Sequence, residues 1–128
     1  MAIEIGTKGY ADALVEQEDT AKVVGSGSLL VYATPCMVAL MEGAACESIA
    51  PFLADGESSV GTMMQLNHTS ATPVGMEVRA ESEVTAVEGR KVTFSIKAYD
   101  EVGEIGNAIH ERFIVKVDRF LEKTYDKL

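Results

Sequence analysis

The chain contains few of the residues that metal sites and disulfide frameworks require. Its 128 residues include only two histidines and two cysteines. With two histidines, a metal site would have to be built mostly from carboxylates, and the sequence shows no cluster of them. The spacing of zinc ligands, the serine nucleophile elbow and the glycine-rich phosphate loop are also missing. The sequence therefore predicts neither a metal nor a bound cofactor.

Positive charge is scarce as well, and it is distributed unevenly. The formal net charge is −9, which argues against nucleic acid or an anionic membrane as the main partner. Nine of the eleven lysines and arginines lie from Arg79 onward, whereas residues 12–19 are rich in acid. The second half of the chain can therefore offer a basic patch to a phosphate-bearing small ligand. The simpler interpretation is that these cations are solvated surface residues.

Long apolar runs and pairable cysteines are missing too. No stretch reaches the ~18 apolar residues of a membrane span, and the first residues lack the basic start of a signal peptide. Cys36 and Cys46 lie in one helical segment, where ten residues separate them by ~15 Å, too far for a disulfide. We therefore expect a cytoplasmic protein. A hydrophobic content of 47% fits a single domain over residues 1–128.

The most regular segment is an apolar helix that starts near Thr34. Thr34 is suited to be its N-cap, with Pro35 at the first helical position, and Pro51 bends or ends it. Only Glu42 and Glu47 are charged between Thr34 and Ala54, so most of the helix should be buried. One face has the i, i+3, i+4 spacing: Met37, Leu40, Met41, Ala44, Ala45, Ser48, Ile49 and Phe52. A second face carries only small residues: Ala39, Gly43, Cys46 and Ala50.

The rest of the chain alternates as β-strands do. A weak strand is expected over residues 9–18, before a short helical turn at 21–24 and the loop Gly25–Ser28. Four further strands are expected over 58–67, 76–87, 91–99 and 106–117. In the first of these four, Val60, Thr62, Met64, Leu66 and His68 share a face; in the last, Ile109, Phe113, Val115 and Val117 do. An antiparallel sheet wrapped around a long apolar helix is an α+β fold of the hotdog type. Its exposed edge strands favour dimers.

Three residues have the chemistry that hydrolysis of an ester or thioester needs. Thr34 supplies a hydroxyl, Glu42 a carboxylate and His68 an imidazole. Taken singly, each has an ordinary structural interpretation: an N-cap, a carboxylate at the rim of the helix, and a core histidine. A hydroxyl at a helix N-terminus is also well placed to stabilise an oxyanion.

Two further residues allow two interpretations each. Arg112 can form a cross-strand ion pair with Glu81 or Glu83, or it can clamp a phosphate or carboxylate. Cys36 lies in the first turn of the helix, where the pKa of a thiol is lowered, and is a rival nucleophile. Alternatively, Cys36 is a small buried hydrophobic residue.

Several motifs together resemble the fluoroacetyl-CoA thioesterase family of hotdog proteins. They agree with that family in type, order and spacing over roughly residues 20 to 118. The motifs are Ala33-Thr34-Pro35, Met41-Glu42-Gly43-Ala44-Ala45, Ser59-Val60-Gly61-Thr62, the segment from Asn67 to Gly75, the segment from Thr85 to Arg90, and His110-Glu111-Arg112.

The resemblance implies an enzyme that hydrolyses short acyl-CoA thioesters to the free acid and CoA. It implies that Thr34, Glu42 and His68 form the catalytic set. Glu42 would attack the carbonyl or activate water, Thr34 would orient the carbonyl or the carboxylate, and His68 would act as general acid and base. It further implies that Gly61 lines the site and that Arg112 contacts the substrate. Coenzyme A enters only as part of the substrate, and the assembly is a homodimer, with pairing into a tetramer left open.

One segment departs from the family pattern. The fluoroacetyl-specific member has phenylalanines before the helix that gate its pocket. In this chain the matching stretch, Gly25 to Leu30, has no aromatic residue. We therefore do not expect selectivity for a fluorinated acyl group. A non-catalytic acyl-CoA or CoA-binding protein on the same fold remains the alternative.

Overall fold

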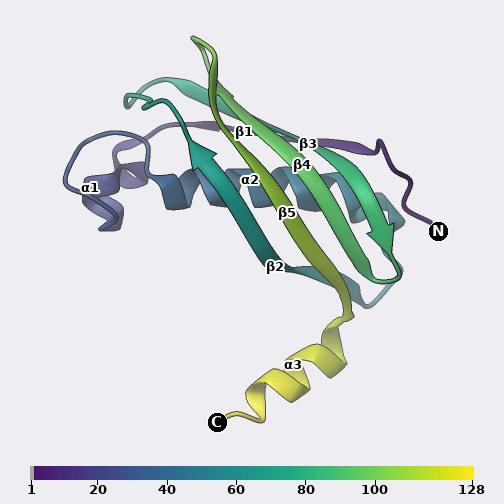
Figure 1. The fold of residues 1–128 in the computed structure, drawn as a ribbon. Helices are drawn as coiled ribbons and strands as arrows, with labels where there is room; N and C mark the ends of the chain where they lie inside the picture. Colours follow the sequence, from purple (N-terminus) through teal and green to yellow (C-terminus); the bar gives the residue numbers. More distant parts are fainter. Residues whose placement is uncertain (1) are drawn as a thin grey trace.

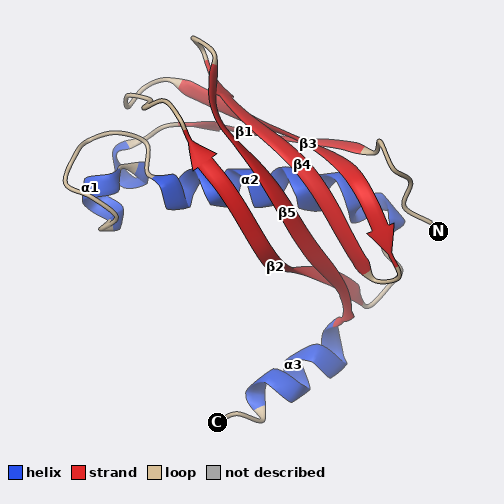
Figure 2. Ribbon diagram, in the orientation of Figure 1, coloured by secondary structure: helices blue, strands red, loops and turns tan. Residues whose placement is uncertain are grey.

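A computed structural model describes residues 2–128, and it shows one long helix held against a curled sheet (Figures 1 and 2). The helix is α2 (Thr34–Ile49). Five antiparallel strands form the sheet in the order β1-β3-β4-β5-β2. Their bounds are β1 (Lys8–Leu14), β2 (Glu57–His68), β3 (Glu77–Glu88), β4 (Lys91–Asp100) and β5 (Glu104–Lys116). The expected α+β hotdog architecture is confirmed.

Short elements complete the chain, and one of them shortens the expected first strand. β1 ends at Leu14 because residues 17–19 form a 3-10 turn, η1 (Gln17–Asp19), in which the Glu16 amide donates to the Asp19 carboxylate at 3.0 Å. Helix α1 (Ala21–Val24) follows, as expected. A second 3-10 turn, η2 (Ala50–Phe52), contains Pro51 and follows the end of α2 at Ile49, and helix α3 (Val117–Tyr125) forms the tail.

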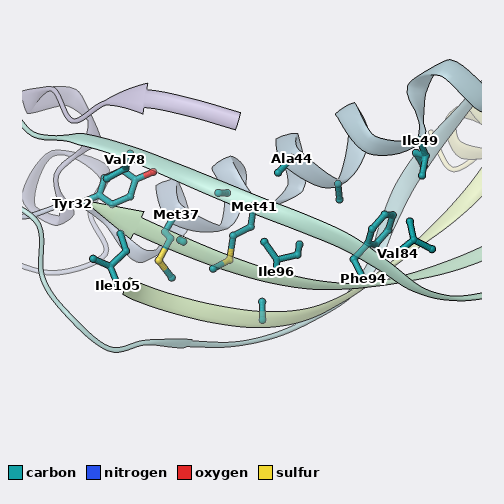
Figure 3. Close-up of a cluster of buried hydrophobic side chains, with 14 of the residues drawn as sticks. Tyr32, Met37, Met41, Ala44, Ile49, Val78, Val84, Phe94, Ile96 and Ile105 are labelled. Carbon is teal, nitrogen blue, oxygen red and sulfur yellow. The ribbon is translucent and has the colours of Figure 1, made fainter. Parts of the chain in front are cut away.

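The core lies between α2 and the concave face of the sheet (Figure 3). The inner face of α2 is the predicted one, with six buried residues: Met37, Met41, Ala44, Ala45, Ser48 and Ile49. They pack against side chains of β3 and β4, among them Val78, Val84, Phe94 and Ile96. β1 approaches α2 most closely at Gly9, where a Cβ atom would collide with the Ala44 carbonyl oxygen and with Ser48. Small residues on both elements therefore set the depth at which the helix sits.

Strand β2 contains a β-bulge that the sequence pattern does not show. Gly61 pairs with Arg112 and Met63 with Glu111, so Thr62 is the extra residue. An extra residue reverses the alternation of side chains along a strand. Ser59 and Gly61 therefore face the helix before the bulge. The prediction that Val60 and Thr62 share the face of the residues after the bulge was wrong.

Strand β5 turns its polar residues inward. His110 is 1% exposed and Arg112 is 6% exposed, whereas Ile109 and Phe113 are 43% and 42% exposed. The apolar face predicted for this strand is thus the outer face of the sheet. Buried polar side chains are stable only when they are hydrogen-bonded, so the inner face of β5 must provide them with partners.

Two apolar surfaces remain uncovered in the single chain. The small-residue face of α2 is exposed at Ala39, Gly43 and Ala50. Helix α3 extends away from the end of β5 (Figure 1) and exposes Leu121 and Tyr125. No helix within residues 2–128 has the length and apolar character to cross a membrane.

Candidate active site

Thr34 is the first residue of α2 and is not its N-cap. Ala33 is the cap, with an extended backbone, and its buried amide donates to the Asp19 carbonyl at 2.8 Å. The predicted cap was therefore wrong by one residue, and Pro35 is at the second helical position. The Thr34 hydroxyl is therefore not needed to cap the helix. It lies 2.7 Å from Nδ1 of His68 instead. The two residues come from opposite ends of the α2–β2 segment and form a direct hydroxyl–imidazole pair.

One ring nitrogen of His68 is occupied by Thr34, and the other, Nε2, is buried and has no hydrogen-bond partner within residues 2–128. Burial lowers the pKa of His68 below its ordinary value, so the ring is neutral near pH 7 and able to accept a proton. The pair lines a hollow of about 290 Å³, together with Tyr32, Ser26 and residues 69–71. Ser26 belongs to the glycine–serine loop, so this loop borders the hollow.

Glu42 occupies a different place, midway along α2. Its side chain is 39% exposed, and its Oε2 atom lies 3.0 Å from an Arg112 nitrogen, Nη1. The buried guanidinium is therefore the partner that a carboxylate at this position needs. Gly61 on β2 lies directly beside it, since a Cβ atom there would be 2.5 Å from Glu42 Oε2. The absence of a side chain at Gly61 leaves room for the carboxylate, as the prediction that Gly61 lines the site requires.

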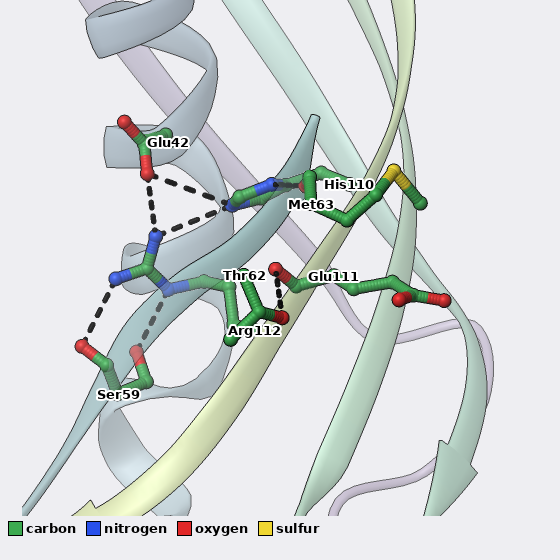
Figure 4. Close-up of polar contacts among 7 residues, drawn as sticks. All are labelled: Glu42, Ser59, Thr62, Met63, His110, Glu111 and Arg112. Carbon is green, nitrogen blue, oxygen red and sulfur yellow. Dashed lines mark hydrogen bonds and ion pairs between the residues drawn. The ribbon is translucent and has the colours of Figure 1, made fainter. Parts of the chain in front are cut away.

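Arg112 is anchored on several sides (Figure 4). Its Nε donates to the Ser59 hydroxyl at 2.8 Å, and its Nη2 donates to the Ser59 carbonyl at 3.0 Å. Its Nη1 donates to Glu42. The alternative of an ion pair with Glu81 or Glu83 was wrong, because Arg112 faces the helix and Glu81 pairs with Arg79 on the outer surface. The guanidinium holds Glu42 in place and gives a local positive charge.

His110 belongs to the same cluster, and the sequence analysis missed it. Its Nδ1 lies 2.7 Å from the Met63 carbonyl oxygen, and its Nε2 lies 3.2 Å from Arg112 Nη1. Phe94 stacks on its ring, with the centroids 5.8 Å apart. The signal in the sequence was the i, i+2 spacing of His110 and Arg112, which places both on one face of a strand.

The candidate residues form two clusters in the single chain. Eight residues separate Thr34 from Glu42, which corresponds to ~12 Å along a helix. Within residues 2–128 no hydrogen bond or ion pair joins Glu42 to Thr34 or to His68. The structure thus brings Thr34 to His68, and Glu42 to Gly61 and Arg112, but it leaves the two groups apart.

Cys36 lacks the environment of a reactive thiol. Burial, with a smaller effect from Asp19, raises the pKa of its thiol above the ordinary value. The lowered pKa expected for the first helical turn is therefore wrong, because the thiol is partly desolvated beside an acidic residue. Within residues 2–128, no three histidine, cysteine or acidic side chains converge as metal ligands would.

Comparisons with known proteins relate this geometry to one family. The model of the fluoroacetyl-CoA-specific thioesterase family matches residues 15–118. The fluoroacetyl-CoA thioesterase of Streptantibioticus cattleyicolor is 42% identical over 97 residues, covering 76% of this chain and 70% of that protein. A solved structure of a fluoroacetyl-CoA thioesterase has a TM-score of 0.94 and 34% identity, covering 100% of this chain and 99% of that chain. A thioesterase superfamily member from Thermus thermophilus has a TM-score of 0.87 and 30% identity, covering 99% and 98%.

The sheet curled around α2 and the proteins that share it define this chain as a thioesterase of the hotdog fold. Within that class, the chain belongs to the fluoroacetyl-CoA-specific thioesterase family. The resemblance inferred from the sequence motifs is therefore confirmed.

Proposed function

We propose that this thioesterase is a homodimer that hydrolyses short-chain acyl-CoA thioesters at sites shared between its two chains. Each site would combine the Thr34–His68 pair of one chain with Glu42 of the other. The observation that carries the proposal is the ~12 Å separation of the two clusters along α2. A single thioester carbonyl cannot be reached by both clusters at once from one chain, because proton transfer requires contacts of about 3 Å.

The position of the clusters relative to β2 supports a shared site. β2 is an edge strand, with β5 on one side and no strand on the other within residues 2–128. If two copies pair through β2 about a two-fold axis, the His68 end of one strand lies beside the Glu57 half of the other. Gly61 and Glu42 lie over that half. The partly exposed carboxylate of Glu42 would then approach the Thr34–His68 pair of the other chain across the dimer interface.

The chemistry follows from these groups. The carboxylate of Glu42 either adds to the thioester carbonyl carbon, expelling the CoA thiolate and leaving an acyl-Glu42 anhydride, or removes a proton from water that adds instead. In both routes negative charge develops on the carbonyl oxygen, where the Thr34 hydroxyl can donate. In the anhydride route the CoA thiolate leaves first, and neutral His68 then accepts a proton from the water that hydrolyses the anhydride and frees Glu42. In the direct route Glu42 takes the water proton, and the thiolate leaves from the tetrahedral adduct and is protonated by solvent. The products are the free acid and CoA, without a metal or another cofactor.

A complementation experiment tests the shared site. Glu42→Ala and His68→Ala homodimers should each be nearly inactive toward acetyl-CoA. If the two variants are unfolded together and refolded as a mixture, half of the dimers combine both chains, and each of these has one intact site. The mixture should regain about one quarter of the wild-type activity. Activity that stays at the level of the separate variants would contradict a site shared between chains.

A second measurement distinguishes the thioesterase from the alternative, a non-catalytic protein that binds CoA or acyl-CoA. Free thiol release is followed across a panel of acyl-CoAs, while the affinity for CoA is measured by calorimetry. Binding without turnover across the whole panel would contradict the enzyme and favour a CoA-binding protein.

The panel also tests selectivity. Ser26 is the residue of the loop from Gly25 to Leu30 that lines the hollow, and this loop has no aromatic side chain to gate it. Acetyl-CoA, propionyl-CoA and fluoroacetyl-CoA should therefore be hydrolysed with kcat/KM values within about 200-fold of one another, since a methylene contributes only ~1–3 kcal/mol of discrimination. We also propose a cytoplasmic location, because the two thiols are free.

A further inference from the structure

His110 is an unusual residue to find in the interior of a sheet. It is 1% exposed, and its neighbours on the inner face include the apolar ring of Phe94. A histidine that serves only to fill space would be replaced without loss by an apolar residue. In this position both of its ring nitrogens are instead within hydrogen-bond distance of a polar partner.

The two partners determine which nitrogen carries the proton. The Met63 carbonyl oxygen can only accept, so Nδ1 must carry a hydrogen and donate to it at 2.7 Å. The Arg112 guanidinium can only donate, so Nε2 must be the unprotonated acceptor at 3.2 Å. His110 is therefore a neutral ring in a single tautomer. Burial lowers the pKa of His110, and the neighbouring Arg112 acts in the same direction, although the bond to Met63 and nearby carboxylates oppose them.

Arg112 in turn divides its donors between structure and function. Nε and Nη2 are bound to Ser59, and the two hydrogens of Nη1 are directed at Glu42 and His110. Because the guanidinium is planar, the acceptor at His110 helps to fix the direction in which Nη1 points toward Glu42. Without this acceptor, one buried N–H of Arg112 Nη1 would have no partner, and the guanidinium would be free to rotate.

We propose that His110 is a positioning residue that orients the carboxylate of Glu42 through Arg112. It does not contact the substrate. The neutral imidazole fixes the guanidinium, the guanidinium binds Oε2 of Glu42, and Oε1 is left to face the thioester. This inference rests on the proposed function, in which Glu42 is the reacting carboxylate.

The test compares three variants of the full-length enzyme. His110→Phe keeps the ring and its stacking on Phe94 but removes the acceptor. Its kcat should fall by about 10–100-fold, as expected when a reacting group is misplaced by about 1 Å, while KM changes by less than about threefold. His110→Gln puts a carbonyl oxygen near the position of Nε2 and should restore kcat to within about threefold of wild type. His110→Asn is too short to reach Arg112 and should be as slow as the phenylalanine variant.

A control separates positioning from general loss of packing. Ile96→Val changes a core residue that is 1% exposed on β4 and has no polar contact with the cluster. It should lower Tm by a few degrees and leave kcat unchanged. If His110→Phe does not fold, the glutamine and asparagine variants still decide. Equal kcat values for these two would overturn the proposal.

The failure of the inference can be told apart from failure of the proposed function. If Glu42→Ala is inactive but His110→Phe keeps full kcat, Glu42 acts without His110, and only the positioning role is lost. If Glu42→Ala keeps full activity, the proposed catalytic role of Glu42 is wrong and the positioning role falls with it.

Discussion

At the scale of single residues, the site depends on how local bonds assign each polar group. Ala33 caps α2, and this leaves the Thr34 hydroxyl available to His68. Ser59 accepts hydrogen bonds from Nε and Nη2 of Arg112, which leaves Nη1 to donate to Glu42. The residue types could be read from the sequence, but these assignments could not, because each joins groups that are distant along the chain.

The two histidines, of which His110 is buried and His68 is partly buried, should make stability depend on pH. Burial lowers the pKa of both His68 and His110 in the folded chain, whereas histidines of the unfolded chain titrate near ~6.5. Below that pH the unfolded chain therefore binds more protons, so stability is complete above ~6.5 and is lost as the pH falls. We expect Tm to decrease from pH 7 to pH 5. His110→Gln removes one of the titrating groups and should show a smaller decrease; an equal decrease would contradict this account.

Two glycines should respond in opposite ways to alanine. At Gly61 the new methyl meets the flexible end of Glu42, which can move, and comes within 3.2 Å of His110 and 3.3 Å of Arg112, so we expect only a small decrease in Tm but activity reduced roughly tenfold or more. At Gly9 it meets the backbone of α2, which cannot move without separating helix and sheet. Gly9→Ala should therefore lower the free energy of unfolding by about 1–3 kcal/mol. Chemical denaturation and thiol-release assays on both variants check the contrast, which would be refuted if Gly61→Ala were the less stable protein.

At the scale of elements, the sequence predicts well the order and type of the helices and strands. It does not always predict which face of a strand points toward the core. The spacing of α2 predicts its buried face, and the alternation of β3 predicts that Val78, Ala80 and Val84 point inward. The alternation rule fails for β2, because the bulge at Thr62 depends on how this strand pairs with β5. The rule also fails for β5. Its polar inner face is stable only because Glu42, Ser59 and Met63 supply hydrogen-bond partners from other elements, which the pattern of one strand cannot show.

The bulge itself should be required for activity. Deleting Thr62 would restore regular alternation in β2, so either the Ser59–Gly61 half or the Met64–His68 half must turn away from the helix. We expect a lower Tm and loss of thioesterase activity by at least about 100-fold. Thr62→Ala is the matched control, because it keeps the extra residue and removes only a hydroxyl that donates to the Glu111 carbonyl at 3.3 Å. A deletion variant as active as this control would show that the bulge has no role.

At the scale of the whole molecule, the apolar surface that the single chain leaves open supports the proposed homodimer. The small-residue face of α2 and the exposed side of α3 both lack a cover within residues 2–128. Apolar patches of this kind mark interfaces. The free edge of β2 offers unpaired backbone groups beside them.

The assembly can be tested directly by mass and dilution. Light scattering should give twice the 13.7 kDa mass of the chain, or a further multiple if dimers pair. Specific activity should fall on dilution below the dimer dissociation constant, because a shared site is lost when the chains separate. Leu121 lies on the exposed side of α3. If α3 contributes to the interface, Leu121→Glu should make the specific activity fall at a higher protein concentration, whereas the neighbouring polar change Glu122→Gln should not. Full activity in a chain shown to be monomeric would rule out the shared site.

The scarcity of histidine gives the protein a built-in spectroscopic reporter. His110 is fixed by its two partners as the tautomer with the proton on Nδ1, while His68 has one partnered nitrogen and one free. Nitrogen-15 imidazole spectra distinguish such environments, and two rings give signals that one substitution assigns. Binding of CoA or an acyl-CoA should move the signals of the ring beside the hollow and leave those of the enclosed ring in place. Events at the two halves of the site could thus be followed separately in one labelled sample.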